Sequence, residues 1–294
     1  MNDGYSYSIQ IPSRARGQSV LSFLADRFDH STAVQWRERI EQGEVTVNEN
    51  VARVDTECRP GDRLVWNRPG WIEADVPLRY SIEFEDDRLL VVDKPSGLPT
   101  LPGGGFLDHT LLNLVRKDFP SASPLHRLGR CTSGLVMMAL DSMTATTLSN
   151  DWPNVLKQYS ALASGVAAED IYDIQTPIGP VDHPRLGKVH AANDSGKPSR
   201  SVARVVERYE STTLFEVDLH TGRPHQIRIH LASIGHRLVG DPLYDTGGIP
   251  RAINPGLPGD GGYFLRAQSL TFTHPISGSV VTVAAGREGW QEHG

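Results

Sequence analysis

The stretch "LHTGRPHQIRIHLASIGHRLVGDPLY", residues 219–244, combines the pattern of a short helix with a high density of cationic and imidazole side chains. Thr221 suits the N-cap of that helix, Pro224 suits its first turn, and Gly235 suits the position just after its last turn. Between these signals, apolar residues recur at the spacing that places them on one face of a helix. The pattern therefore predicts a helix whose buried face is formed by Ile227, Leu231 and Ile234.

Cationic side chains gather at the expected start of this helix, at Arg223, His225 and Arg228. The N-terminus is the positive end of the helix dipole, where an exposed cation costs about 0.3–1 kcal/mol. A stretch selected only for stability would avoid this arrangement, whereas an anion-binding site would use it. Gly222 also allows the backbone to approach a ligand closely. We therefore interpret the stretch as an anion site; the alternative is an ordinary capped helix with surface arginines.

A second cationic turn precedes an apolar strand in "PLHRLGRCTSGLVMMALD", residues 124–141. No carboxylate appears in this stretch before Asp141, so no acid that is close in sequence neutralises the turn. Lys94 similarly ends the apolar run "LLVVDKPSG", residues 89–97. Basic turns at strand ends are typical of sites that contact phosphates. We therefore assign to a binding site Lys94 and the turn residues His126, Arg127 and Arg130.

Residues 81–288 read as one larger domain that is built mostly of strands. The runs "LLVVDKPSG" and "GLVMMAL" are continuously apolar, as expected for strands that are buried on both faces. The segments "KQYSALASG" and "TTLFEVDLHTG" alternate instead, as expected for strands with one face in the core. Helical patterns are fewer. The sequence therefore predicts a mixed α+β fold around a large, mainly antiparallel sheet.

A separate small domain is expected before the larger one. Two helical patterns, capped by Ser19 and by Ser31 or Thr32, precede segments that alternate as short strands around residues 48–50. A segment rich in Pro and Gly follows, which indicates a linker. The predicted boundaries are 1–16 for an N-terminal extension, 17–68 for the small domain, 69–80 for the linker, 81–288 for the larger domain and 289–294 for a tail.

The net charge of −6 is unusual for a protein that binds nucleic acid, but the charges are unevenly distributed. Acidic residues concentrate before residue 88, whereas residues 182–208 are basic and residues 220–238 contain no acid. We therefore expect a cationic surface on the larger domain. The two cysteines, Cys58 and Cys131, suit a reducing cytosol. Neither a secretory signal nor an apolar run of membrane-spanning length is visible, so we expect a cytoplasmic protein.

Three other kinds of site are excluded by spacing. The histidines of residues 220–236 do not share one helical face and form no His-Glu-x-x-His pair, so no metal site is predicted. The segment "LPGGGFLDH" lacks the Gly-Lys-Ser/Thr ending of a phosphate loop. Ser133 lacks the Gly-x-Ser-x-Gly pattern of a nucleophile elbow.

Several of these stretches together resemble the successive motifs of the RluA-type RNA pseudouridine synthases. The resemblance runs from about residue 83 to residue 285, and the segment "VVDKPSGLPTLPGGG" is similar to the leading Lys-Pro-x-Gly motif of the family. Residues 17–68 resemble an S4-type RNA-binding module; the alternative is a unit that serves only in packing or partner contact. The later motifs are "HRLGRCTSGLVMMAL", "KQYSALASG", "HTGRPHQIRIHLASIGHRLVGDPLY" and "LRAQSLTFTHPISG".

This resemblance implies an isomerase that converts uridine in structured RNA to pseudouridine, an RNA modification that needs no cofactor. The target base must be flipped out of its stack, at a cost of about a few kcal/mol. By resemblance, Arg127 fills the gap that the base leaves in the RNA, and Tyr159 contacts the uracil and assists proton transfer at carbon 5. Arg228 holds and orients the catalytic carboxylate.

The chain departs from the family pattern His-Arg-Leu-Asp, because its fourth position is Gly129. The family's Asp triggers cleavage of the glycosidic bond, which glycine cannot do. Asp141 lies a strand's length away, at roughly 3.3 Å per residue. Cys131 is a possible surrogate, since a thiolate beside arginines is a nucleophile, and Asp108 in the preceding loop is another candidate.

Two main readings follow. The first is a pseudouridine synthase that acts on ribosomal or transfer RNA with a carboxylate supplied from elsewhere. The second is a non-catalytic RNA-binding protein or RNA chaperone that retains the pocket. A nucleotide-binding protein of unrelated chemistry is a weaker third. Structured RNA is the expected partner, with no membrane or metal, and a monomer is the default.

Overall fold

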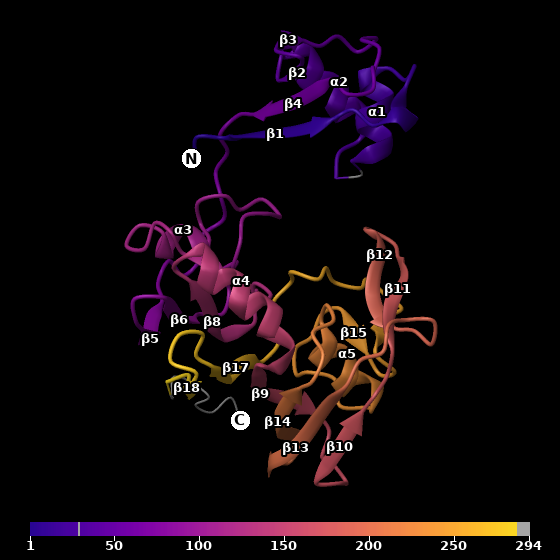
Figure 1. The fold of residues 1–294 in the computed structure, drawn as a ribbon. Helices are drawn as coiled ribbons and strands as arrows, with labels where there is room; N and C mark the ends of the chain where they lie inside the picture. Colours follow the sequence, from indigo (N-terminus) through magenta and orange to yellow (C-terminus); the bar gives the residue numbers. More distant parts are fainter. Residues whose placement is uncertain (29, 287–294) are drawn as a thin grey trace. The chain divides into compact units, whose positions relative to one another are not determined.

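The computed structural model of this 294-residue chain describes every residue except 29 and 287–294. The chain forms two compact units, one spanning Met1–Glu73 and the other beginning at Ala74 (Figure 1). The predicted tail, residues 289–294, lies outside the described residues.

The first unit packs two helices on a four-stranded sheet with the strand order β1-β4-β2-β3. The sequence predicts an N-terminal extension at residues 1–16, but β1 belongs to this sheet and runs antiparallel to β4. The reason is the alternation of "YSYSIQI", which places Tyr7 opposite Trp66 with ring centroids 5.3 Å apart. The elements are β1 (Tyr5–Gln10), α1 (Val20–Arg27), α2 (Ala33–Glu41), β2 (Val45–Val47), β3 (Asn50–Val51) and β4 (Arg63–Arg68).

Local signals define the helix starts and the hairpin of this unit. Ser19 caps α1, and Thr32 rather than Ser31 caps α2, in a reciprocal capping box with Gln35. Asn48 and Glu49 turn the chain between β2 and β3 with φ of 47° and 68°. A two-residue turn of this kind requires positive φ at both positions, which Asn tolerates better than most residues. The Asn48 side chain holds the turn, since its Oδ1 accepts a hydrogen bond from Arg63 N–H at 2.9 Å.

The second unit is built on a ten-stranded sheet, which confirms the predicted α+β class with a large, mainly antiparallel sheet. Its central path runs β10-β13-β14-β9-β17-β8-β6-β5, and only the pairing of β17 with β8 is parallel. The strands are β5 (Ser81–Glu85), β6 (Leu89–Lys94), β7 (Ser123–Pro124), β8 (Ser133–Ala139), β9 (Leu156–Ser164), β10 (Ile171–Ile174), β13 (Ser201–Arg208), β14 (Thr212–Leu219), β17 (Leu265–Thr273) and β18 (Val280–Ala284).

Strands β6 and β8 are buried on both faces, which explains their continuous apolar runs. Leu90 and Met138 belong to the core on one face of the sheet, whereas Leu89 and Met137 belong to the core on the other. Gly134 of β8 allows the close approach of β17, because a Cβ there would collide with the backbone of Ala267. Its φ of 104° also favours glycine.

Three helices and two hairpins complete this unit (Figure 1). Helix α5 packs against the β11–β12 hairpin and the β15–β16 hairpin. The basic helix predicted from the sequence is therefore in contact with two hairpins of this unit. The elements are α3 (Leu111–Val115), α4 (Ser142–Asp151), β11 (Ile178–His183), β12 (Gly187–Ala192), α5 (Gln226–Ser233), β15 (Tyr244–Asp245) and β16 (Ile249–Pro250).

Candidate active site

Gly129 lies in the turn between β7 and β8, and its carbonyl accepts a hydrogen bond from Thr132 N–H at 3.1 Å. The glycine is exposed, and a Cβ at this position would lie 3.4 Å from the hydroxyl oxygen of Tyr263. The same Cβ would lie 3.5 Å from Thr132 Oγ1. A side chain at position 129 would therefore project toward buried Tyr263, with room for a Cβ after a shift of a few tenths of an ångström.

Lys94 is fully buried, and its Nζ donates hydrogen bonds to three carbonyls, those of Pro95, Leu98 and Arg130. These bonds join the turn after β6 to the turn before β8. Burial lowers the pKa of Lys94 to about 7. The assignment of Lys94 to RNA contact is therefore corrected, because a side chain with no exposed surface cannot reach RNA.

Replacing Lys94 by Met is expected to lower the free energy of unfolding by about 2–4 kcal/mol, since one buried and two part-buried carbonyls lose their donor. Urea denaturation followed by circular dichroism measures this change. Lys188→Met is the matched control, because that side chain is 69% exposed and should change stability by no more than about 0.5 kcal/mol. Equal effects of the two substitutions would contradict a clamping role for Lys94.

His126 is likewise structural in this fold. Its Nε2 accepts a hydrogen bond from Met137 N–H at 3.0 Å, and its ring stacks on Trp152 with centroids 4.6 Å apart. Burial, assisted by the charge of Lys157, lowers the pKa of His126 to about 3, so the ring is neutral at neutral pH. The predicted RNA contact at His126 is corrected, since the ring is occupied in positioning β8.

The two arginines of the turn differ in their availability. Arg127 is exposed, as its predicted role in RNA contact requires. Arg130 donates two hydrogen bonds, from Nε and Nη2, to the carbonyl of Gly259 at 3.1 and 2.9 Å. Arg223 is half-buried, and its Nε donates to the carbonyl of Pro198. Of these side chains, Arg127 is therefore the one with most of its surface open to a ligand.

Helix α5 begins later than the sequence predicts. Its N-cap is His225, which has a left-handed backbone with φ of 55°, so Pro224 precedes the helix and Thr221 is not the cap. The reason is Gln226, whose Oε1 accepts hydrogen bonds from Arg223 N–H and from the Thr221 hydroxyl. Gly235, with φ of 89°, ends the helix as predicted.

Arg228 is buried and paired with a carboxylate that the sequence analysis missed. Its Nε and Nη2 donate to the two oxygens of Asp241 at 2.7 and 2.8 Å, and both side chains are at most 2% exposed. Nη1 donates to the carbonyl of Pro258 at 3.1 Å. The guanidinium lies 4.3 Å from the ring centroid of Tyr263 and 5.0 Å from that of Tyr244. The only sequence signal for this pair is that Asp241 is the first acid after the basic stretch.

Asp241 is held as an anion with all of its hydrogen-bonding capacity in use. Besides Arg228, its Oδ1 accepts bonds from the backbone N–H groups of Leu243 and Tyr244. Burial by itself raises the pKa of Asp241, but the hydrogen bonds and charge of Arg228 outweigh it and hold the pKa below its usual value. A carboxylate that is so fully bonded is a structural anchor for Arg228 rather than a nucleophile.

His225 has its tautomer fixed by Tyr244. The Tyr244 hydroxyl must donate to the carbonyl of His190, at 2.6 Å, so it accepts from His225 Nδ1–H at 2.7 Å. Nε2 is then the unprotonated nitrogen of the ring. Burial, followed by the charge of Arg228, lowers the pKa of His225 to about 3. The ring is thus neutral at neutral pH and offers a hydrogen-bond acceptor, not the positive charge that the sequence analysis ascribes to this position.

Tyr159 lies on β9 between Val217 of β14 and Ala267 of β17. It is 8% exposed, and its burial raises the pKa of the phenol to about 12. No hydrogen-bond partner of its hydroxyl occurs among the residues that the structure describes. One buried cluster unites this side chain with residues of the 129–132 turn, of α5 and of the segment before β17, namely Leu128, Cys131, Ile227 and Tyr263.

Cys131, the predicted surrogate nucleophile, is 8% exposed, and its thiol donates weakly to the carbonyl of Gly259 at 3.7 Å. Asp108 lies in the loop before α3. Within the described parts of the chain, no three His, Cys, Asp or Glu side chains gather as metal ligands would. No helix there has the length and apolar character needed to cross a membrane.

The site therefore consists of an exposed arginine, an acceptor histidine, a buried phenol and a locked arginine around the position of Gly129. Comparisons with known proteins show the family of this chain. Residues 88–233 match the family model of RNA pseudouridylate synthases. The chain is 39% identical to an uncharacterized RNA pseudouridine synthase of Synechocystis sp., over 87% of this chain and 89% of that protein.

Further relatives extend the match. RNA pseudouridine synthase 5 of Arabidopsis thaliana is 35% identical over 92% of this chain and 89% of its own length. Ribosomal large subunit pseudouridine synthase D of Xanthomonas campestris is 32% identical over 94% and 87%. The solved structure of human RNA Pseudouridylate Synthase Domain Containing 1 superposes with a TM-score of 0.57 at 25% identity, covering 73% of this chain and 86% of that chain. This chain therefore belongs to the RNA pseudouridine synthase family.

Proposed function

We propose that the protein isomerises a flipped-out uridine of structured RNA to pseudouridine. The observation that carries this proposal is the buried grouping of Tyr159, Arg228 and Tyr263. The exposed Arg127 is the chain neighbour of Leu128, which belongs to the same buried cluster as the two tyrosines. Such a grouping suits a base that leaves its stack and enters a dry pocket while a cation takes its place. Ribosomal RNA is the favoured substrate, because one relative is named a ribosomal large subunit pseudouridine synthase.

The finer features of the proposal follow from the site. The reaction breaks the bond from C1′ to N1, turns the uracil and forms a bond from C1′ to C5, for which no cofactor is needed. Arg228 acts as a positioning residue, since Asp241 holds it in place. Residues 17–68 serve as an S4-like RNA-binding module, a role supported by their two helices and small sheet. We expect a cytoplasmic monomer.

A second candidate function is a non-catalytic RNA-binding protein or RNA chaperone. The observation that favours it is Gly129, which carries no side chain where the family pattern has its catalytic Asp, while Arg228 is already paired with Asp241. This protein would still flip and hold a uridine, but would leave it unchanged.

Tritium release from RNA labelled at carbon 5 of uridine separates the two candidates. The substrate is deproteinised cellular RNA, and the proteins are the natural chain and its Gly129→Asp variant. Release by the natural chain above background is the expected result and supports the synthase. Release by the variant alone would instead support the RNA-binding protein.

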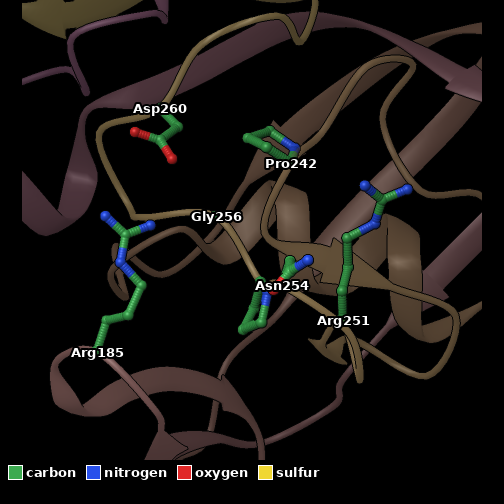
Figure 2. Close-up of a pocket in the computed structure, with 7 residues that line it drawn as sticks. Arg185, Pro242, Arg251, Asn254, Gly256 and Asp260 are labelled. Atoms are coloured by element: carbon green, nitrogen blue, oxygen red, sulfur yellow. The ribbon is translucent and has the colours of Figure 1, made fainter.

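A basic pocket near the site offers a test of RNA contact. The cavity has a volume of about 420 Å³, and in Figure 2 Arg185 and Arg251 lie on either side of the segment that contains Asn254 and Gly256. Within the described structure neither guanidinium forms an ion pair. His183 fixes this arrangement, because its Nδ1 accepts from Arg185 N–H and its Nε2–H then donates to the carbonyl of Gly256.

Replacing both Arg185 and Arg251 by Gln is expected to weaken RNA binding and to reduce the slope of log affinity against log salt by about 2, one for each lost phosphate contact. Filter binding between low and moderate salt measures the slope. The control is Arg204→Gln, because Asp218 already pairs with that guanidinium. An unchanged slope in the double variant would exclude this pocket from the RNA-binding surface.

A further inference from the structure

The segment of residues 256–263, here called the strap, covers the turn in which the family's catalytic Asp is missing. The carbonyl of Pro258 accepts from Arg228 Nη1, and that of Gly259 accepts from Arg130. At its other end the Tyr263 hydroxyl lies 3.3 Å from Thr132 Oγ1. The strap therefore contacts Arg130 and Thr132, which follow Gly129 in the turn, and it also contacts the positioning arginine.

Two residues in the middle of the strap, Gly259 and Gly261, lie close to Cys131. The carbonyl oxygen of Gly259 is 3.7 Å from Cys131 Sγ, and a Cβ on Gly261 would be 2.7 Å from the same sulfur. Asp260 stands between these two glycines, so both of its chain neighbours touch a residue that is two positions from Gly129. Asp260 is also the only acidic residue of the strap.

Other carboxylates of this unit already have structural roles. Asp241 accepts four hydrogen bonds from buried donors. Asp141 caps α4 through Thr144 and pairs with Arg88. Asp93 is paired with Arg266 in a buried ion pair. None of these groups can leave its partners without uncovering a cation or a helix terminus, which would cost free energy.

Asp260 is bound much more lightly. Its Oδ2 accepts one hydrogen bond, from Leu257 N–H at 2.7 Å, and its Oδ1 has no partner among the described residues. The carboxylate lines the pocket of Figure 2. Gly259 and Gly261 flank it, and Gly262 has φ of 109°, so the backbone around Asp260 is free of Cβ atoms that would hinder its rotation.

We propose that Asp260 supplies the catalytic carboxylate that the sequence lacks at position 129. The proposal rests on the proposed synthase function. Turning of the strap at its glycines moves the Asp260 side chain from the pocket of Figure 2 to the space beside Gly129, where the absence of a Cβ leaves room for it. On this proposal Gly129 lacks the side chain that the family pattern has there, and Asp260 of the strap supplies the carboxylate in its place.

The chemistry balances without a co-reactant. A carboxylate oxygen of Asp260 bonds to C1′ as the C1′–N1 bond breaks, and the electron pair of that bond leaves with uracil. After uracil turns, C5 attacks C1′, the bond to Asp260 breaks, and its electron pair returns to the carboxylate. C5 then loses its proton to water and N1 gains one from water.

The test compares four full-length proteins in the tritium-release assay: the natural chain, Asp260→Asn, Asp260→Asn combined with Gly129→Asp, and the control Asp194→Asn, an exposed acid after β12. We expect Asp260→Asn to reduce the rate by at least about 10³-fold, since removal of a covalent nucleophile costs up to about 10⁶-fold. The combined variant should recover activity, because a carboxylate returns to the turn. Asp194→Asn should leave the rate unchanged.

Each other outcome counts against the proposal in a distinguishable way. An active natural chain with an equally active Asp260→Asn variant overturns the inference and leaves the synthase function standing. The same holds if Asp108→Asn, and not Asp260→Asn, abolishes release. Failure of the combined variant to recover activity also overturns it. If the natural chain releases no tritium above background, the proposed function and the inference are both overturned.

Discussion

Replacement of Asp241 by Asn is expected to lower the free energy of unfolding by about 3–5 kcal/mol, the largest stability effect that the site offers. The substitution leaves the guanidinium of Arg228 buried with no anion beside it, and the pair is at most 2% exposed. It also weakens the acceptor for the backbone N–H groups of Leu243 and Tyr244. Urea denaturation of the full chain measures the loss.

The matched control for this prediction is Asp245→Asn. Asp245 pairs with Arg237 at 3.6 Å, but the two side chains are 49% and 35% exposed. An exposed pair contributes at most about 1 kcal/mol, because solvent screens it. If Asp241→Asn and Asp245→Asn destabilised the protein equally, burial of the Arg228 pair would make no special contribution to stability.

The same ion pair predicts a pH dependence of stability. The pKa of Asp241 is lower in the folded chain than its ordinary value of about 3.9. Its contribution is therefore fully present above about pH 4 and is lost as the pH falls through the folded pKa. Acid unfolding of the natural chain should be steeper below about pH 4 than that of Asp241→Asn, which carries no titrating carboxyl at this position.

The sequence predicted those parts of the fold that depend on local pattern. The alternation of "KQYSALASG" and the continuous apolar run of "GLVMMAL" correctly indicate one-faced and two-faced burial in β9 and β8. Gly235 correctly ends α5, because a left-handed C′ position is a local requirement that glycine meets. Such features need only neighbours in the chain.

The features that the sequence did not predict depend on tertiary neighbours. Lys94 and His126 read as ligand-binding cations, but distant backbone groups take up their hydrogen-bonding atoms. The partner of Arg228 is set by the fold of the chain after α5, which no periodicity reports. The position of the strap was also not predicted, because a run of Gly and Pro residues gives no pattern from which a contact with Cys131 could be inferred.

The position of Gly129 shows how sequence and structure complement each other. The motif alone shows a missing side chain, and composition offers several acids that could replace it. The structure restricts the choice, because most nearby carboxylates are bound in ion pairs or caps, whereas Asp260 has one light contact on a segment fastened over the turn. Catalysis at this site therefore depends on a carboxylate that can move to the space beside Gly129, and Asp260 is the one with the fewest bonds to break.

Tyr159→Phe is expected to reduce tritium release by about 10²- to 10³-fold, the loss that follows removal of one preorganised hydrogen-bond donor to the reacting group. The change removes only a hydroxyl that has no partner in the described structure, so stability should change by less than about 1 kcal/mol. RNA affinity should also persist, because the ring remains in the pocket. Single-turnover release and filter binding measure the two quantities separately.

The control for Tyr159→Phe is Tyr172→Phe. Tyr172 lies in β10, and its hydroxyl accepts a hydrogen bond from the backbone N–H of Glu169. This variant should keep the rate of the natural chain. Equal losses in the two variants would mean that a phenol is needed for folding and not for the reaction.

The pH profile then decides the form in which Tyr159 acts. Burial raises the pKa of its phenol to about 12, so the group is protonated throughout the range from pH 6 to pH 9. A protonated phenol donates a hydrogen bond to the uracil and cannot take the proton from carbon 5, which must therefore pass to another acceptor. If Tyr159 acted as a phenolate, the rate would rise tenfold for each pH unit across this range, and the rise would vanish in Tyr159→Phe. We expect no such rise, because in this pocket the tyrosine is a donor that orients the base, while water takes the proton from carbon 5 and supplies the proton to N1.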